Sequence, residues 1–205
     1  MKKVEFFFDC SSPWTYLAFH RFQSIIKDVN VDIYWKPILV GGVFNEVNQD
    51  VYNNRLNPNP LKFKYSRKDL QDWANYCQIS INWPKVFPLN AVNVMRAVIA
   101  SEAFGKLIPF SYLCFEKYWS NGIDISDIKV LSELAFSIDI NKEEFEKKIV
   151  IQNTKDLLRS NTDELINRGG FGSPTIFIDG DDMYFGNDRM ELVRQKIIEG
   201  SDENN

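Results

Sequence analysis

The hydrophobic pattern of the first 40 residues predicts a strand, a helix and a second strand. Residues 3–9 are a short aromatic run bounded by polar turn residues, which is typical of a buried strand. Ser12 suits the position that caps a helix, and Pro13 suits the first turn. Residues 31–38 alternate as a second strand, so we expect a right-handed crossover between two parallel strands. Apolar residues at helical spacing predict the helix between them: Trp14, Leu17, Ala18, Phe22, Ile25 and Ile26.

Helical patterns dominate the middle of the chain, after a loop rich in glycine, asparagine and proline. One helix is expected to begin at Ser126, and Asn141 with Glu144 forms a capping-box pattern at the start of another. Further helices are expected at residues 65–77, 91–104, 110–119 and 154–168.

The end of the chain returns to strands. Residues 175–179 and 183–185 predict a hairpin, and residues 188–199 predict a last helix with Asp188 and Glu191 spaced as a capping box. The resulting order, β-α-β, helices, then β-β-α, is that of a thioredoxin-like α/β fold with a large all-helical insertion. We therefore predict a thioredoxin-like domain of residues 1–40 and 166–205, and a helical insertion domain of residues 41–165. The tail 200–205 is expected to be frayed.

Composition excludes several classes of function. The chain has 205 residues, 44% hydrophobic residues and a net charge of −4, which suits a folded domain and does not favour nucleic acid. No apolar run approaches the roughly 18 residues of a membrane span. Charges interrupt the segment after Lys3 where a signal peptide would be apolar, so we expect a cytoplasmic protein. Three scattered cysteines and one histidine predict neither a disulfide framework nor a metal site.

A hydroxyl at a helix start is the first candidate for chemistry. Backbone N–H groups and the helix dipole favour negative charge beside Ser12, where a thiolate would be stabilised. Serine cannot form a disulfide, so the thiol would come from a ligand. The alternative is that Ser12 only caps the helix.

Two further motifs lie near the end of the chain. Ser173 and Pro174 directly precede a strand, where a cis peptide bond and pairing with an extended ligand are expected; a plain turn is the alternative. Asp188 could accept the ammonium group of a γ-glutamyl ligand or simply cap the last helix, and Asn187 supplies an amide beside it.

Together these motifs resemble the 2-hydroxychromene-2-carboxylate isomerases and the related kappa-class glutathione transferases. The resemblance runs from about residue 4 to residue 195 and includes an Asn-Pro-rich loop at residues 57–60. It implies that Ser12 is the catalytic residue at the glutathione sulfur. It also implies six other glutathione contacts: Ser173, Pro174, Asn187, Asp188, Lys62 and Asn57. Loop length varies, so Asn53 competes with Asn57.

The same resemblance implies the rest of the site. Substrate would contact Trp14, Asn57, Lys62, Trp83 and Phe87. Cys10 replaces the apolar residue usual in relatives, and it is either a small buried residue or a second thiol near the site.

The implied activity is a glutathione-dependent isomerase that interconverts 2-hydroxychromene-2-carboxylate and trans-o-hydroxybenzylidenepyruvate, acting as a homodimer on a small aromatic electrophile. One alternative is a kappa-class-like glutathione transferase or peroxidase. The others are a DsbA-like disulfide oxidoreductase and a non-catalytic glutathione-binding protein.

Overall fold

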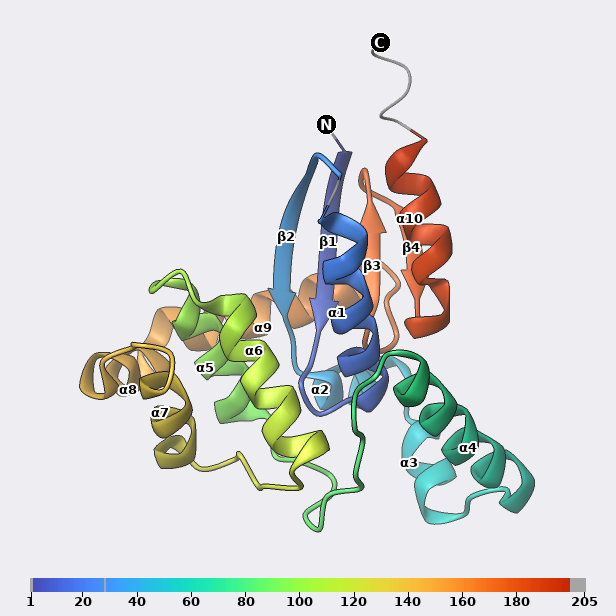
Figure 1. Cartoon of the computed structure of the whole chain (residues 1–205), viewed down its shortest axis with the longest axis horizontal. Coiled ribbons are helices and arrows are strands. Elements are labelled where there is room, and N and C mark those ends of the chain that lie inside the picture. The colour runs from blue at the N-terminus through green and yellow to red at the C-terminus, as the bar shows by residue number, and fades with distance from the viewer. Residues whose placement is uncertain (1, 28, 200–205) are drawn as a thin grey trace.

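A four-stranded sheet forms the centre of the computed structural model, which describes residues 2–27 and 29–199 (Figure 1). The strand order is β2-β1-β3-β4. β1 and β2 are parallel, whereas β3 runs antiparallel to both β1 and β4. The order confirms the predicted thioredoxin-like arrangement. The strands are β1 Lys2–Phe8, β2 Val31–Pro37, β3 Thr175–Ile178 and β4 Asp182–Phe185.

Helices cover both faces of the sheet and continue into a group beyond its end (Figure 1). A π-helical turn, Glu116–Ser120, extends α6, and a 3-10 turn, Asn187–Arg189, precedes α10. The helices are α1 Pro13–Ile26, α2 Val40–Val47, α3 Asp50–Leu56, α4 Pro60–Tyr76, α5 Val92–Glu102, α6 Leu107–Phe115, α7 Ile128–Phe136, α8 Lys142–Val150, α9 Gln152–Asn167 and α10 Met190–Ile198.

β1 is buried on both faces because its aromatic side chains alternate between them. Phe6 packs towards α1, with its ring 4.9 Å from that of Phe22. Phe7 points to the opposite face, where it meets Phe177 at 5.7 Å and joins Leu165 of α9 in a second apolar cluster. The period of two along a strand explains why consecutive phenylalanines supply two separate cores.

The prediction of a loop after residue 40 is wrong, because the chain forms α2 and α3 there. Val40 and Val43 lie on the buried side of α2. Gly42 allows α2 to approach α9 closely, since a Cβ atom at that position would lie 3.3 Å from Cγ2 of Thr162. Tertiary packing thus stabilises a short helix whose glycine-rich sequence favours a loop.

Two helix starts also differ from expectation. α4 begins at Pro60 rather than residue 65, because the Asn59 side chain accepts hydrogen bonds from the N–H groups of Leu61 and Lys62. The capping box expected at the start of the last helix is wrong. Asp188 pairs with Arg189, and Glu191 pairs with Arg21 of α1. By contrast, Asn141 caps α8 through the Glu144 N–H, as predicted.

The division at residues 165 and 166 falls inside α9, and the two-domain description stays a prediction. The tail 200–205 lies outside the described residues. Among the described helices, none is both long and apolar enough to cross a membrane.

A buried ion pair joins β1 to the end of α9. Glu5 is only 5% exposed, and its carboxylate contacts Arg168 at 3.0 Å and Lys3 at 3.1 Å. Burial raises the pKa of Glu5, but these two cations outweigh it and leave the pKa below its ordinary value of 4.5. Arg168 also donates to the Gly180 carbonyl.

Replacing Arg168 with methionine is expected to lower the free energy of unfolding by about 3 kcal/mol at pH 7, because a buried carboxylate loses its main partner. In the wild type the pairing contributes stability above pH 4.5 that is lost as the pH falls through the lowered pKa of Glu5, so the two proteins should converge in acid. Urea unfolding at several pH values measures this difference in the free energy of unfolding.

The control is Arg159→Met, at an exposed pair with Asp163, which should change stability by less than about 0.5 kcal/mol. Equal stability of both variants would contradict the expectation.

Candidate active site

Ser12 lies where the chain turns from β1 into α1. Its Oγ atom accepts a hydrogen bond from the backbone N–H of Thr15 over 3.2 Å, and Pro13 occupies the first turn. The side chain therefore caps α1, as its sequence position indicates. Ser12 is also partly exposed. Its hydroxyl consequently stands where the N–H groups and dipole of α1 favour a bound anion.

The Ser173–Pro174 peptide bond is cis, as predicted, and its carbonyl group contacts Ser12. Ser12 Oγ donates to the carbonyl oxygen of Ser173 over 3.4 Å. The hydroxyl of Ser173 accepts from the N–H of Asp9 at 3.0 Å and bonds to the hydroxyl of Thr15 at 2.8 Å. Within the described chain, the backbone N–H of Ser173 forms no hydrogen bond. The fold therefore brings Ser12, Ser173 and Pro174 together and leaves one backbone donor free.

Asp9 is a buried carboxylate behind this group. One oxygen accepts the N–H of Ser11 and the other accepts the N–H of Val40, each over 2.8 Å. Burial raises the pKa of Asp9 above its ordinary value, although the two N–H groups favour the charged form. The carboxylate ties the loop before α1 to the start of α2.

Asn187 is held next to the cis-proline by Arg21. The N–H of Gly186 donates to the carbonyl of Pro174 over 3.2 Å. Arg21 Nη1 donates to the backbone oxygen of Asn187 at 2.7 Å and to its Oδ1 at 3.3 Å. Asn187 is 2% exposed, and its Nδ2 is buried with no hydrogen-bond partner within the described chain. Such an unpartnered donor is uncommon and calls for a ligand or another explanation.

Arg21 itself packs against two aromatic rings of α4. Its guanidinium lies over the ring of Trp73 at 4.6 Å and over that of Tyr76 at 5.8 Å, both in α4. Its other nitrogen pairs with Glu191 at 3.3 Å. Asp188, next to Asn187, is exposed and pairs with Arg189 at 3.2 Å. The turn of residues 187–189 therefore presents a fixed amide and an exposed carboxylate.

An aromatic cluster contacts the loop before Ser12 through Trp119. The rings of Trp83 and Phe87 are 4.8 Å apart, and Trp119 lies 5.8 Å and 6.2 Å from them. Trp119 is fully buried, and its Nε1 donates to the carbonyl of Cys10 over 3.0 Å. Trp83 is 44% exposed. The cluster therefore joins the loop before Ser12 to a surface that solvent reaches.

Other expected contacts are not drawn into this group. Trp14 is partly buried and packs on the main core. Asn57 lies at the end of α3 and Lys62 in the first turn of α4, and both are exposed, as is Asn53. Within the described chain, the side chains of these three residues form no hydrogen bond or ion pair.

Cys10 is enclosed in the core. Its side chain is fully buried, and burial together with the neighbouring Cys114 thiol raises the pKa of Cys10 well above its ordinary value. A protonated, enclosed thiol is a poor nucleophile. Of the two readings of Cys10, the small buried residue fits this environment.

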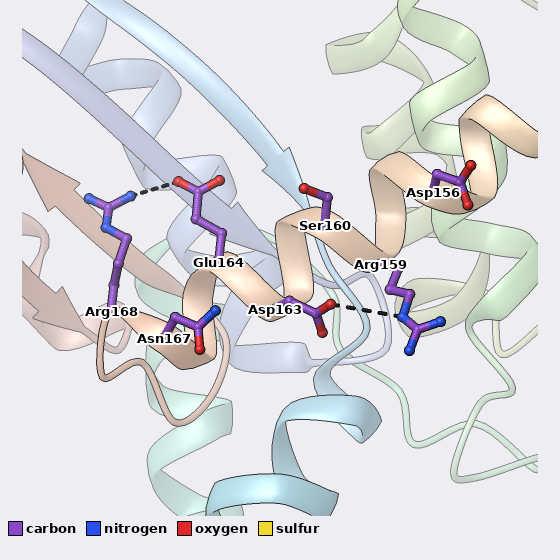
Figure 2. Close-up of a pocket in the computed structure, with 7 residues that line it drawn as sticks. All are labelled: Asp156, Arg159, Ser160, Asp163, Glu164, Asn167 and Arg168. Atoms are coloured by element: carbon purple, nitrogen blue, oxygen red, sulfur yellow. Dashed lines mark hydrogen bonds and ion pairs between the residues drawn. The ribbon is translucent and has the colours of Figure 1, made fainter.

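A hollow of ≈ 560 Å³ runs along α9 and has a different character (Figure 2). Figure 2 shows two of its cations already paired, Arg159 with Asp163 and Arg168 with Glu164. None of the residues assigned above to the candidate site lines it. The hollow is lined by Asp156, Arg159, Ser160, Asp163, Glu164, Asn167 and Arg168. The candidate site at Ser12 therefore lies apart from this hollow.

Sequence reasoning missed four residues that shape the site: Asp9, Thr15, Arg21 and Trp119. Asp9 gave one usable signal, since a charged residue that directly ends an apolar strand is unusual. Arg21 and Trp119 act on segments 166 and 109 residues away, so no local pattern indicates them.

Known proteins share this fold. The DSBA-like thioredoxin domain family matches residues 3–198. The chain belongs to this family.

The similarity of this DSBA-like chain to its relatives extends over nearly its whole length. A 2-hydroxychromene-2-carboxylate isomerase of Pseudomonas sp. (strain C18) is 28% identical over 198 residues, which cover 95% of this chain and 89% of that protein. Glutathione S-transferase kappa 1 of Homo sapiens is 27% identical, covering 97% and 92%. A solved structure of a 2-hydroxychromene-2-carboxylate isomerase has a TM-score of 0.81 at 25% identity and covers 98% of this chain and 97% of that one.

Removing the Asp9 carboxylate is expected to destabilise the fold. Asp9→Ala leaves two backbone N–H groups without acceptors, which should lower the free energy of unfolding by about 3 kcal/mol. Because the pKa of Asp9 is raised in the folded state, protonation favours folding, and the gap to the variant should widen as the pH falls from 7 towards 4. Denaturant unfolding of both proteins, with Asp32→Ala on the exposed side of β2 as control, measures the effect. A gap that narrows in acid would contradict the raised pKa.

Proposed function

We propose that this chain is a glutathione-dependent isomerase that interconverts 2-hydroxychromene-2-carboxylate and trans-o-hydroxybenzylidenepyruvate. The observation that carries the proposal is the hydroxyl of Ser12 at the start of α1, hydrogen-bonded to the residue before the cis-proline. A hydroxyl there can donate to a thiolate but cannot form a disulfide with it. Relatives named as 2-hydroxychromene-2-carboxylate isomerases support the substrate class.

Polar groups of Ser173, Asn187 and Asp188 suit the parts of glutathione. The buried Nδ2 of Asn187 suits the carboxylate of the γ-glutamyl residue, and the exposed carboxylate of Asp188 suits its ammonium group. The free N–H of Ser173, before Pro174, can pair with the ligand backbone as an added strand does. We assign Asn57 and Lys62, at the junction of α3 and α4, to the outer part of the same ligand or to the substrate.

Ser12 would hold the sulfur through its hydroxyl proton. When bound, glutathione supplies a thiolate whose reversible addition to the conjugated double bond allows rotation, after which elimination restores the alkene and frees the tripeptide unchanged. Ser12 keeps its bond from the Thr15 N–H in this role and gives up a long 3.4 Å bond to Ser173. Thiols at helix N-termini have pKa values lowered from about 8.5 to roughly 3.5–7.5, and the start of α1 offers a bound thiol this environment. Trp83 and Phe87 would receive the aromatic ring, and Trp14 stays a predicted substrate contact.

Two other activities are separable from this one. A kappa-class-like transferase would use the same glutathione residues and consume the tripeptide, and the human relative supports it as the second candidate. Disulfide exchange of the DsbA type needs a reactive cysteine pair, whereas positions 12 and 15 are Ser12 and Thr15, and Cys10 is enclosed. The resemblance also implies a homodimer, and we propose a cytoplasmic location. Light scattering would test the first and cell fractionation the second.

The direct test incubates the purified protein with trans-o-hydroxybenzylidenepyruvate, with and without glutathione, and counts free thiol at the end. Conversion that requires glutathione and leaves the thiol count unchanged supports the isomerase. Conversion with loss of thiol favours the transferase. Absence of glutathione binding would overturn both.

Ser12→Ala is expected to lower glutathione-dependent turnover by about 100-fold, since the charge that develops at sulfur loses its hydroxyl donor. Ser24→Ala removes an exposed hydroxyl from the same helix and serves as the control. Steady-state kinetics at saturating glutathione give the comparison. Equal turnover by the two variants would place the chemistry elsewhere.

Arg21→Met is expected to raise the dissociation constant of glutathione about tenfold, because Asn187 loses the two hydrogen bonds that fix its amide. Turnover at saturating glutathione should change little, since Ser12 is untouched. Calorimetric titration measures the affinity, and Arg194→Met, on the exposed side of α10, is the control. An unchanged affinity in the Arg21 variant would remove Asn187 from the binding site.

A further inference from the structure

Two arginines cover the aromatic pair that Trp83 and Phe87 form. The Cζ atom of Arg55, in α3, lies 5.3 Å from the ring centre of Phe87. The Cζ atom of Arg67, in α4, lies 5.2 Å from the ring centre of Trp83. Because the two rings are 4.8 Å apart, the two guanidinium groups share one small aromatic surface although they come from different helices (α3 and α4 in Figure 1).

Neither guanidinium has a carboxylate partner within the described chain. Arg21, Arg168 and Arg189 are each paired with an acidic side chain. Arg55 and Arg67 instead lie beside aromatic rings, since Arg55 is also 5.7 Å from Phe44 and Arg67 is 5.8 Å from Phe63. Neither guanidinium forms a hydrogen bond within the described chain, so the N–H groups of both are available to a ligand. Both residues are exposed, so a ligand can reach these groups.

The aromatic surface is joined to the candidate site by Trp119. The Trp119 ring packs against both Trp83 and Phe87, and its Nε1 donates to the carbonyl of Cys10, two residues before Ser12. Aromatic rings beside unpaired guanidinium groups are suited to a ligand that carries both an aryl ring and an anion. Arginine binds carboxylates through two parallel N–H bonds, which fixes orientation as well as charge.

We propose that Arg55 and Arg67 bind the carboxylate of the electrophilic substrate while its aryl ring lies against Trp83 and Phe87. This inference rests on the proposed function, because trans-o-hydroxybenzylidenepyruvate is an aryl α-keto acid. The two arginines then select anionic aryl substrates over neutral ones and set which end of the substrate faces Ser12. The competing source of a carboxylate is glutathione itself, and the experiment separates the two.

The test compares Arg55→Met, Arg67→Met and the double variant with the wild type. Methionine keeps an unbranched apolar stem and removes the charge. Calorimetry on protein saturated with S-methylglutathione, which has no thiol to add to the substrate, measures the affinity for trans-o-hydroxybenzylidenepyruvate and, separately, for its methyl ester. Each single variant is expected to weaken binding of the acid about tenfold and the double variant roughly 100-fold, as for loss of charge-assisted bonds. Binding of the ester and of glutathione should stay within about twofold of the wild type.

Lys64→Met is the matched control, since it removes one exposed cation from α4 without touching the aromatic pair. It should bind the acid as the wild type does, and thermal unfolding verifies that every variant is folded.

Four results would overturn the inference, and the first three concern the variants. These are an equal loss for acid and ester, a loss of glutathione affinity in place of acid affinity, and wild-type affinity in the double variant. A wild type that binds neither acid nor ester would overturn it as well. The measurement needs no turnover, so it is independent of the isomerase. A wild type that converts no substrate but prefers acid to ester, and loses this preference in the double variant, would overturn the isomerase and keep the arginine site.

Discussion

Hydrogen bonds centred on Ser173 hold the two ends of the thioredoxin-like fold in one arrangement. The Ser173 hydroxyl contacts Asp9 and Thr15, and its carbonyl contacts Ser12. The end of β1, the start of α1 and the start of β3 therefore meet at one residue that is 8% exposed. Loss of these bonds would leave buried donors unpaired, which typically costs about 1–3 kcal/mol for each group. The position of the Ser12 hydroxyl thus depends on the docking of two distant chain segments as well as on α1.

The helical segment of residues 41–165 contacts the candidate site at two places, Arg21 and the Cys10 carbonyl, and contributes to the site through them. Trp73 and Tyr76 of α4 hold Arg21, which orients Asn187 on the side of the cis-proline. Trp119 donates a hydrogen bond to the carbonyl of Cys10. It lies in a π-helical turn, a feature often found at functional sites. One contact shapes the proposed glutathione site, and the other carries the aromatic surface proposed for the substrate. A change in the helical segment can therefore alter substrate selection without altering the residues around sulfur.

Local chemistry explains why the sheet, the first helix and the cis-proline could be predicted from the sequence. Alternating aromatics in β1, the Ser12–Pro13 start of α1 and the Ser173–Pro174 pair each act within a few residues. The Asn59–Pro60 start of α4 is the same cap-and-proline signal, and it was missed because the first turns of α4 are exposed and lack apolar periodicity. α2 could not be predicted in this way, since it depends on contact between Gly42 and Thr162 of α9. Arg21 and Trp119 likewise have partners far along the chain, so their roles emerge only from the fold.

The proposed chemistry depends on glutathione being held as a thiolate beside Ser12. Calorimetric titration at pH 7 in buffers of different ionisation enthalpy counts the protons released on binding and tests this directly. A free cysteine thiol, with a pKa of about 8.5, is mostly protonated at that pH. We predict release approaching one proton for each glutathione bound and none for S-methylglutathione, which has no thiol to ionise. Equal proton counts for the two ligands would mean that the bound thiol stays protonated, and would contradict the role given to Ser12.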